Sequence, residues 1–473
     1  MGLLTMLSFL LSLASTLGIL ALQSASVRFL AHYLAEGKRD KARSVVTRVL
    51  QVSLVTSLVI MLVLLIFAGE ISHVFASPVT ILILLPFCSA LSIFYSQAQG
   101  FLQGLQKFRD FAAISILHSV IRYSIAVVLV YAGFGVLGIV ISWLATLVLI
   151  CLISLTVTFR SLKPSKHAHD LRPLLVFSFP IYVSVLLSFV VGWVDQIFIF
   201  PFLGLEALGV YNLAVRASMV PNLVSVAIAT SLFPKLAELH SRFGVGSLRD
   251  AFKSSARYAA LLGFPISLMV AVLAYPIIVL FATVRFIDAV GPLAVMCIAS
   301  LPTILGSAIY PTFYTLKRTK LASSIIAVSI ASEALLSFVF LAYFKVGLAG
   351  VAFSRLFAAV VVFVFGAYFL RKLLEIEFDR EALWKSAAAS AAMVLSIFAL
   401  EVLRSLIEPA SYQFLVLHLR QLPIYAVAGG IVYISALILL RTVKKGDVDL
   451  LRDYLPSRLR WITNLLDRVI HTN

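Results

Sequence analysis

The sequence predicts an all-α membrane protein, a polytopic helical bundle of about thirteen spans. Of its 473 residues, 62% are hydrophobic and only 12% are charged, and the mean hydropathy is +1.06. Runs of about 20 apolar residues, the length that crosses a bilayer as a helix, recur along the whole chain. The short alternating strands of a membrane β-barrel are not seen in it. A soluble protein of this length does not have such a composition.

Thirteen apolar segments are candidate membrane spans. Several exceed the roughly 20 residues that a bilayer requires, so we expect them to tilt, to kink or to project into water. In chain order the segments cover residues 3–34, 45–67, 80–105, 111–131, 136–159, 174–202, 205–239, 252–281, 289–316, 321–343, 348–370, 384–406 and 422–440.

Prolines interrupt several of these segments. Each proline removes a backbone hydrogen bond and tends to bend its helix. Such bends suit a protein whose halves rock during alternating access, and static kinks are the alternative. The prolines are Pro86, Pro180, Pro221, Pro265, Pro276 and Pro302.

The positive charge lies mainly in alternate connections and in the C-terminal tail, and the net charge is +17. Because cytoplasmic connections are enriched in lysine and arginine, this asymmetry predicts a multi-pass protein of the cell (plasma or cytoplasmic) membrane with a cytoplasmic C-terminus. The basic connections suit anionic lipid headgroups, and we expect no nucleic-acid partner. The basic set covers residues 38–43, 107–109, 160–172, 242–249, 317–320 and 371–380, and the opposite set has chiefly Arg285, Lys345, Arg404 and Arg420.

The chain contains a parallel internal repeat, in which three ordered matches share an offset of about 206 to 212 residues. The matched pairs are ASVRFLAHYLAEGKRDKARSVV (25–46) with SLFPKLAELHSRFGVGSLRDAFKSSA (231–256), KFRDFA (107–112) with KRTKLA (317–322), and GVLGIVIS (135–142) with GLAGVAFS (347–354).

The repeat predicts two pseudo-symmetric six-helix lobes and two further helices. The first lobe covers residues 1–160 with five helices, the second lobe covers 171–371 with six, and the two extra transmembrane helices lie within 384–441. The counterpart of the span 174–202 falls before Met1, so we expect the first lobe to lack its opening helix. An odd number of spans with a cytoplasmic C-terminus also places Met1 outside. An upstream start codon is the explanation that we favour.

The C-terminal residues 442–473 have a different pattern from the rest of the chain. Basic residues there alternate with apolar ones at helical spacing, Leu455, Leu459, Trp461 and Leu465 among them. The pattern favours an amphipathic helix on the cytoplasmic membrane surface, with a solvated helical tail as the alternative.

Two apolar segments, 174–202 and 205–239, carry polar side chains and are joined by a short turn at 204–207. Asp195 continues a stripe with Ser184, Ser188 and Gly192 on one helix face, Gln196 follows it, and Asn212 and Arg216 stand one turn apart in the second segment. Ionisable groups inside membrane helices are expensive, so they indicate a transport pathway.

Equivalent helices of the two lobes also carry polar side chains. The segment 111–131 has His118 and Arg122 on one face, and its repeat counterpart, 321–343, has Glu333. If the lobes face each other across a cleft, these groups would line it. Arg28 lies near the cytoplasmic end of the first span.

These residues predict a polar, cationic cavity between the lobes. Arginine suits phosphate because its planar fork makes paired hydrogen bonds and stays ionised. The alternative for Asp195 and Glu333 is a buried structural ion pair, for example Asp195 with Arg216 or Arg122 with Glu333. Arg28 could instead extend to the interface, and His118 could be a hydrogen-bonded helix residue rather than a proton relay.

We find no sequence signal of an enzyme. The chain has no P-loop for ATP, no zinc-type cluster of histidines and cysteines, and no long polar loop. The three cysteines, Cys88, Cys151 and Cys297, lie scattered in apolar segments. We therefore expect no catalytic residues, no metal and no cofactor, and we expect Na⁺ or H⁺ as a coupling ion rather than direct ATP hydrolysis.

Four motifs resemble the polysaccharide-biosynthesis flippases of the multidrug/oligosaccharidyl-lipid/polysaccharide (MOP) exporter superfamily. SFPIYVSVLLSFVVGWVDQIFI (178–199), FLGLEALGVYNLAVRASMVP (202–221) and ATSLFPKLAE (229–238) look like the opening of the family's second lobe, and VRFLAHYLAEGKRDKAR (27–43) resembles the end of its second helix. The resemblance covers essentially the whole chain and implies fourteen helices.

The resemblance implies export of a lipid-linked oligosaccharide, a glycan on a polyprenyl phosphate or pyrophosphate, from the cytoplasmic to the outer leaflet for surface polysaccharide or glycoconjugate assembly. Such transporters hold the headgroup in a cationic cavity, so Arg28, Arg122 and Arg216 become headgroup-binding candidates, with His118 and Asn212 beside them. Asp195 and Glu333 are candidates for coupling or for an ion pair.

Three other functions stay open. A multidrug cation antiporter of the same superfamily would need acids in the first-lobe cavity, where the visible helices offer Arg122 and His118 instead. A membrane glycan polymerase or ligase would be expected to have a large outside loop, and the longest outside connection is about 407–421. A structural membrane scaffold is the third.

Overall fold

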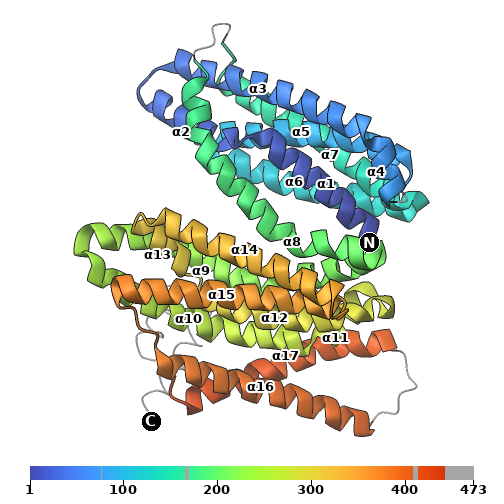
Figure 1. The fold of residues 1–473 in the computed structure, drawn as a ribbon, viewed down its shortest axis with the longest axis vertical. Coiled ribbons are helices and arrows are strands. Elements are labelled where there is room, and N and C mark those ends of the chain that lie inside the picture. The colour runs from blue at the N-terminus through green and yellow to red at the C-terminus, as the bar shows by residue number, and fades with distance from the viewer. Residues whose placement is uncertain (76, 166–169, 408–413, 443–473) are drawn as a thin grey trace. The chain divides into compact units, whose positions relative to one another are not determined.

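The computed structural model describes residues 1–75, 77–165, 170–407 and 414–442, and in these ranges the chain is helical without any strand (Figure 1). The all-α prediction is confirmed. Helices are what such an apolar chain requires, because a backbone in hydrocarbon must satisfy its polar groups within its own segment. The predicted surface helix of the tail lies outside the described residues from position 443 onward.

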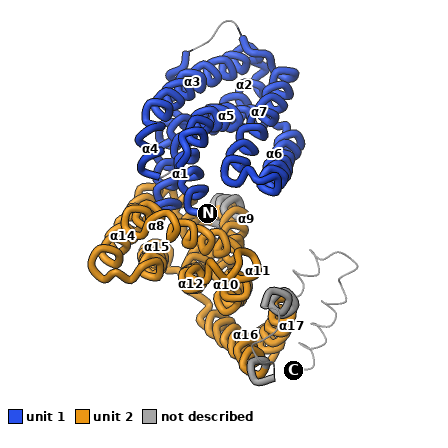
Figure 2. Tube along the Cα trace, turned by 90° about the vertical axis from the view of Figure 1, so that its right-hand side faces the viewer, with its two compact units in different colours: residues 1–193 blue, residues 194–473 orange. Residues whose placement is uncertain are grey.

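Residues 1–193 form one compact unit, here called unit 1 (Figure 2). In it α5 packs against α1, α2, α3 and α7, and α6 packs against α7. The helices are α1 (Gly2–Ile19), α2 (Leu22–Ala35), α3 (Arg39–Ile66), α4 (Ala68–Phe75), α5 (Val79–Gly104), α6 (Phe108–Leu129), α7 (Gly135–Ser161) and the first part of α8 (Arg172–Ala217).

Residues 194–473 form the second compact unit, unit 2. Its helices are the rest of α8, α9 (Met219–Phe243), α10 (Val245–Val272), α11 (Ala274–Ala282), α12 (Val290–Leu305), α13 (Ile309–Thr315), α14 (Thr319–Ala342), α15 (Leu348–Leu374), α16 (Arg380–Ile407) and α17 (Phe414–Leu439).

The same packing order occurs in both units. In unit 2, α12 packs against α10 and α15, and α14 packs against α15. In unit 1, α5 packs against α3 and α7 in the same way, and α6 packs against α7. Each unit also has a buried apolar cluster built from corresponding elements, around Val46 and Phe101 in unit 1 and around Phe252 and Phe313 in unit 2. This order agrees with the sequence repeat. The lobe limits 1–160 and 171–371 stay a prediction, because α8 is shared by both units.

Eleven helices of the described residues are long and apolar enough to cross a membrane, against thirteen predicted spans. Two of the eleven, Phe108–Ser161 and Arg172–Ala217, have 54 and 46 residues. At about 1.5 Å per residue they are roughly twice as long as a hydrocarbon core of about 30 Å requires. Each contains a glycine with positive φ, 90° at Gly133 and 81° at Gly204, at which the helix turns. Phe108–Ser161 therefore accounts for two predicted spans, 111–131 and 136–159. Arg172–Ala217 covers 174–202 and only the first part of 205–239, and the rest of that predicted span lies in α9.

The first predicted span, 3–34, is broken inside the apolar segment. Leu20 and Ala21 have φ of 49° and 52°, so α1 ends there and α2 begins. The break frees the carbonyls of α1, and three side chains from other helices of unit 1 donate hydrogen bonds to them. These are Tyr182 to Leu17 (3.2 Å), Thr56 to Gly18 (3.0 Å) and Gln97 to Ile19 (3.1 Å). The freed backbone groups are thus satisfied within the protein.

Just beyond this break, α2 packs closely on two glycines of α5. A Cβ atom at Gly100 would lie 2.9 Å from the Gln23 carbonyl oxygen and 3.1 Å from its Cα, and one at Gly104 would lie 3.0 Å from the Ser26 carbonyl oxygen. Small residues four apart allow two membrane helices to approach at backbone distance.

We expect Gly100→Ala to lower stability by about 1–3 kcal/mol, because the new methyl group must displace the backbone of α2. The matched control is Gly192→Ala in α8, where nothing lies within 4 Å of the new Cβ. Thermal unfolding of both variants in detergent micelles measures the difference. Equal midpoints for the two variants would contradict the close α2–α5 approach.

Candidate functional site

A buried polar cluster lies where the two arms of α8 fold back on one another in unit 2. Gly204 adopts a φ of 81°, which glycine reaches without the steric penalty of a side chain. The first arm then hydrogen-bonds to the second at two levels, Asp195 with Tyr211 and Gln196 with Asn212. The turn expected at 204–207 therefore brings together side chains that are 16 residues apart in the chain.

Asp195 is the centre of this cluster and is fully buried. One carboxylate oxygen, Oδ2, accepts hydrogen bonds from the Tyr211 hydroxyl (2.9 Å) and from Nη1 of Arg355 (2.5 Å). The other oxygen, Oδ1, accepts one from the backbone N–H of Gln196 (2.8 Å). Three donors, one of them a guanidinium, thus satisfy both oxygens of this buried carboxyl group, and hydrogen bonds of this charge-assisted kind are the strong ones.

Arg355 is the partner of Asp195, and the sequence interpretation missed it. It lies on α15, two turns after the helix begins, and its side chain is 30% exposed. The expected alternative pair of Asp195 with Arg216 is wrong, because α15 supplies the cation instead. The same signal that singled out Arg122, an arginine inside an apolar segment, would also have found Arg355. It directly follows the repeat motif GLAGVAFS.

Glu333 is the second acid of the cluster. It lies on α14, is 5% exposed, and interacts electrostatically with Asp195 and Arg355. Its Oε1 atom has no hydrogen-bond partner among the described residues, and neither has the hydroxyl of Ser337 one turn further along α14. Arg355 thus forms an ion pair with Asp195 and interacts electrostatically with Glu333 as well. In the described part of the chain, no group of three or more His, Cys, Asp or Glu side chains could hold a metal ion.

A second hydrogen-bonded chain orients Arg216. The Nε atom of Arg216 donates to Oδ1 of Asn212 (2.7 Å), and Nδ2 of Asn212 donates to Oε1 of Gln196 (3.0 Å). Gln196 and Asn212 are buried, whereas Arg216 is exposed. The two amides therefore position a guanidinium group that keeps donors available to an anion.

In unit 1, the predicted face of α6 carries a half-buried cation. The guanidinium carbon of Arg122 lies 4.8 Å from the centre of the Trp143 ring of α7. One turn earlier, His118 stacks on Tyr95 of α5 at a ring distance of 5.0 Å, and it interacts electrostatically with Arg122. Aromatic faces attract cations, so these rings stabilise positive charge inside the unit.

Arg28 has a different environment. Its guanidinium lies over the Phe177 ring of α8 at 4.4 Å, and the Phe29 ring is 5.9 Å away. The residue is exposed and stands seven positions before the end of α2. Aromatic rings thus contact Arg28 in the middle of α2, as the Trp143 ring contacts Arg122 on α6. The roles predicted for both arginines stay predictions.

A family model described as polysaccharide biosynthesis protein matches residues 2–291 of the chain. No curated protein matches the sequence.

Solved structures with similar folds are transporters. The chain is similar to the lipid II flippase MurJ in an inward closed conformation, with a TM-score of 0.73, 18% identity and coverage of 93% of this chain and 91% of that one. It is also similar to an inward-facing multidrug resistance MATE family transporter of the MOP superfamily, with a TM-score of 0.66, 18% identity and coverage of 79% of this chain and 91% of that one. A third similar structure is that of a MOP superfamily transporter from Pyrococcus furiosus, with a TM-score of 0.55, 16% identity and coverage of 79% of this chain and 87% of that one. The fold is that of MOP superfamily transporters.

Breaking the Asp195–Arg355 pair should destabilise the protein. Asp195→Asn or Arg355→Gln leaves one charge buried without its partner, and we expect each to lower the free energy of unfolding by about 3–5 kcal/mol. The double variant should lose less than the sum of the two. Denaturant unfolding in detergent micelles measures this double-mutant cycle.

The control for this cycle is the exposed pair of Arg285 with Glu206, 3.2 Å apart and 79% and 81% exposed. Glu206→Gln should change stability by less than about 1 kcal/mol. Strictly additive losses at Asp195 and Arg355 would show that the two residues are not energetically linked.

Proposed function

The chain belongs to the polysaccharide biosynthesis protein family, and we propose that it flips a lipid-linked oligosaccharide from the cytoplasmic to the outer leaflet of the cell membrane. The glycan is carried on a polyprenyl phosphate or pyrophosphate, and the protein moves it by alternating access. The fold of MOP superfamily transporters supports this assignment, and so does the polarity of unit 1.

The observation that carries the proposal is the cation on α6. Arg122 stands 14 residues from the start of a 22-residue helix, about 20 Å along it, well inside an apolar segment. An ionised side chain at that depth is expensive and is retained where it meets a charged substrate or partner. A phosphate headgroup is the anion that a planar guanidinium binds best, through paired hydrogen bonds. We assign Arg122 to the headgroup, with His118 beside it.

The position of acids in the sequence argues against a multidrug cation antiporter. In α1 to α7 the acidic residues, Asp40, Glu70 and Asp110, stand in first turns of helices, and no acid lies in the interior of a span. A cationic drug would need a carboxylate within the membrane. Unit 2 does have acids inside its spans, Asp195 and Glu333 of the polar cluster among them.

We assign the coupling ion to that cluster, and we propose a proton rather than Na⁺. Arg355 already balances the charge of Asp195, so Glu333 is the one carboxylate left to neutralise, and a single proton does this. Two carboxylates sharing a site disfavour double ionisation. Release of the proton would return a second negative charge to the contact between α8, α14 and α15, and it would bias the packing of these helices.

Arg122→Ala should abolish flipping of lipid-linked glycan while leaving membrane insertion intact, and Arg122→Lys should retain only part of the rate because it lacks the fork. Flipping in reconstituted vesicles measures both. The control is Arg109→Ala, which removes an exposed arginine from the first turn of the same helix. Unchanged flipping by Arg122→Ala would remove Arg122 from the mechanism. Efflux of a cationic drug by the wild-type protein, without glycan flipping, would favour the antiporter.

Glu333→Gln should make transport insensitive to an imposed pH gradient, because the amide stays in the neutral form. The control variant is Glu206→Gln, which changes an exposed acid of the same unit. Its transport should respond to the pH gradient as that of the wild type does. Transport into vesicles with opposite pH gradients, with and without sodium, is the measurement. A wild-type response to a sodium gradient at constant pH would contradict proton coupling.

A further inference from the structure

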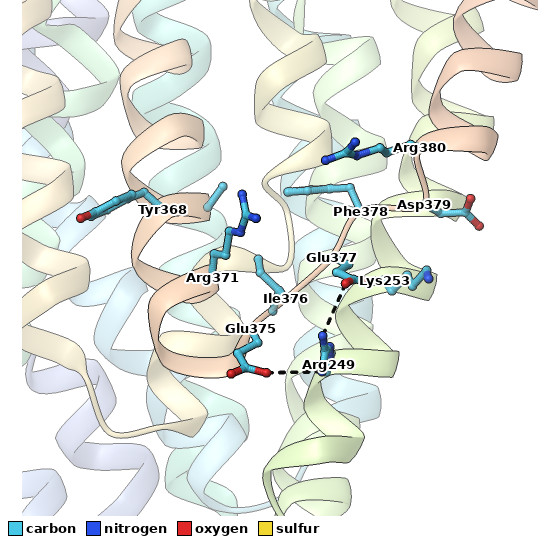
Figure 3. A pocket seen from close by; sticks show the side chains of 11 residues that line it. Arg249, Lys253, Tyr368, Arg371, Glu375, Ile376, Glu377, Phe378, Asp379 and Arg380 are labelled. Atoms are coloured by element: carbon cyan, nitrogen blue, oxygen red, sulfur yellow. Dashed lines mark ion pairs between the residues drawn. The ribbon is translucent and has the colours of Figure 1, made fainter.

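A cavity of about 870 Å³ lies at the end of α15, away from the polar cluster on α8 (Figure 3). It is lined by the first turns of α10, the last turns of α15, the connecting residues 375–379 and the first residue of α16. The lining contains four cations, Arg249, Lys253, Arg371 and Arg380, and no part of the transport mechanism described above involves them.

The acids of the cavity have partners in the protein. Arg249 forms ion pairs with Glu375 (3.7 Å) and Glu377 (3.6 Å), shown as dashed lines in Figure 3. Asp379 accepts a hydrogen bond from the backbone N–H of Ala382 (3.1 Å), which caps the start of α16. The Asp379 carboxylate points away from Arg380 in Figure 3. These contacts hold the connecting residues 375–379 in place. They pair two of the acids with Arg249 and the third with the start of α16.

Three cations of the cavity are left over. Lys253, Arg371 and Arg380 are exposed, and no side-chain hydrogen bond or ion pair joins them to another described residue. They come from three separate elements, α10, α15 and α16. Figure 3 shows Arg371 and Arg380 at the two ends of the connecting segment, with Phe378 drawn between them. Three positive charges that line one cavity repel one another. An anionic ligand bound in the cavity would offset this repulsion.

Aromatic side chains beside the cations indicate the depth of the cavity in the membrane. Tyr368 is 61% exposed and stands one turn before Arg371 on α15, and both line the cavity. Exposed tyrosines that accompany basic residues at a helix end are typical of the headgroup level of a bilayer. At that level the available anions are phosphates, and a guanidinium binds them with two parallel hydrogen bonds.

We propose that this cavity binds the phosphate group of an anionic ligand, either the headgroup of a membrane phospholipid or a soluble phosphate compound. Lys253, Arg371 and Arg380 supply the positive charge. Arg249 is held by its two glutamates and shapes the wall. The site is independent of the transported glycan, because none of its cations is assigned to the headgroup pathway.

The test compares a triple variant, Lys253→Gln, Arg371→Gln and Arg380→Gln, with a control triple, Arg109→Gln, Arg318→Gln and Lys320→Gln. The control removes the same charge from exposed positions in other connections. Native mass spectrometry of the full chain in detergent measures binding of phosphatidylglycerol, with phosphatidylcholine as the neutral lipid. Each cation near a charged surface contributes about fivefold to binding, so we expect the cavity triple to bind phosphatidylglycerol at least roughly tenfold more weakly.

The control triple should bind phosphatidylglycerol clearly more tightly than the cavity triple, because its three cations belong to two separate connections and none of them lines this cavity. Inorganic pyrophosphate is the second probe. Its binding is measured as an increase in the thermal unfolding midpoint of the protein in detergent. Loss of phosphatidylglycerol binding in the cavity triple alone supports the site and identifies a lipid source. Loss of pyrophosphate stabilisation alone supports it with a soluble source. Equal binding of both probes by the two triples, with unchanged elution on size exclusion, would overturn the proposal.

Discussion

The structure depends on one constraint, which is that a polar group in hydrocarbon must find its partner within the protein. At the break of Leu20–Ala21, the side chains of Thr56, Gln97 and Tyr182 donate hydrogen bonds to the carbonyls that α1 leaves free. The fold at Gly204 similarly places two arms of α8 where Asp195 and Gln196 can meet Tyr211 and Asn212. In both places the helix interruption and the polar contacts stabilise each other.

The same constraint is met unequally by the two acids of the polar cluster in unit 2. Asp195 is satisfied by three donors, one of them Arg355, whereas Oε1 of Glu333 has no hydrogen-bond partner among the described residues. Replacing a buried ion pair by well-packed apolar side chains is often neutral or stabilising, so a contribution to stability does not by itself account for these charges. Under the function proposed above, this acid is the proton-binding site, and its position at the contact of three helices would link protonation to their packing.

The two units show how a repeated architecture can acquire different polarities. The helices α6 and α14 correspond in the repeat, yet one carries Arg122 beside an aromatic ring and the other carries Glu333 beside an ion pair. Corresponding helices of the two units therefore carry opposite charges. Under the function proposed above, the substrate and the coupling ion would bind to different units, which differ in these side chains and not in the packing order of their helices.

Most of the fold could be predicted from the sequence, because hydrophobic length and basic connections depend on local composition alone. The thirteen apolar segments, the turn at Gly204 and the repeat were visible in this way. The broken first span was not, since Leu20 and Ala21 carry no local signal of positive φ. For the site, the sequence by itself identified Asp195, Arg122 and Glu333 as charged residues inside apolar helices. Only the tertiary structure decided that Asp195 pairs with Arg355, 160 residues away, and not with the nearer Arg216. An ion pair depends on which helix faces are brought together, and that depends on packing, which a single sequence does not reveal.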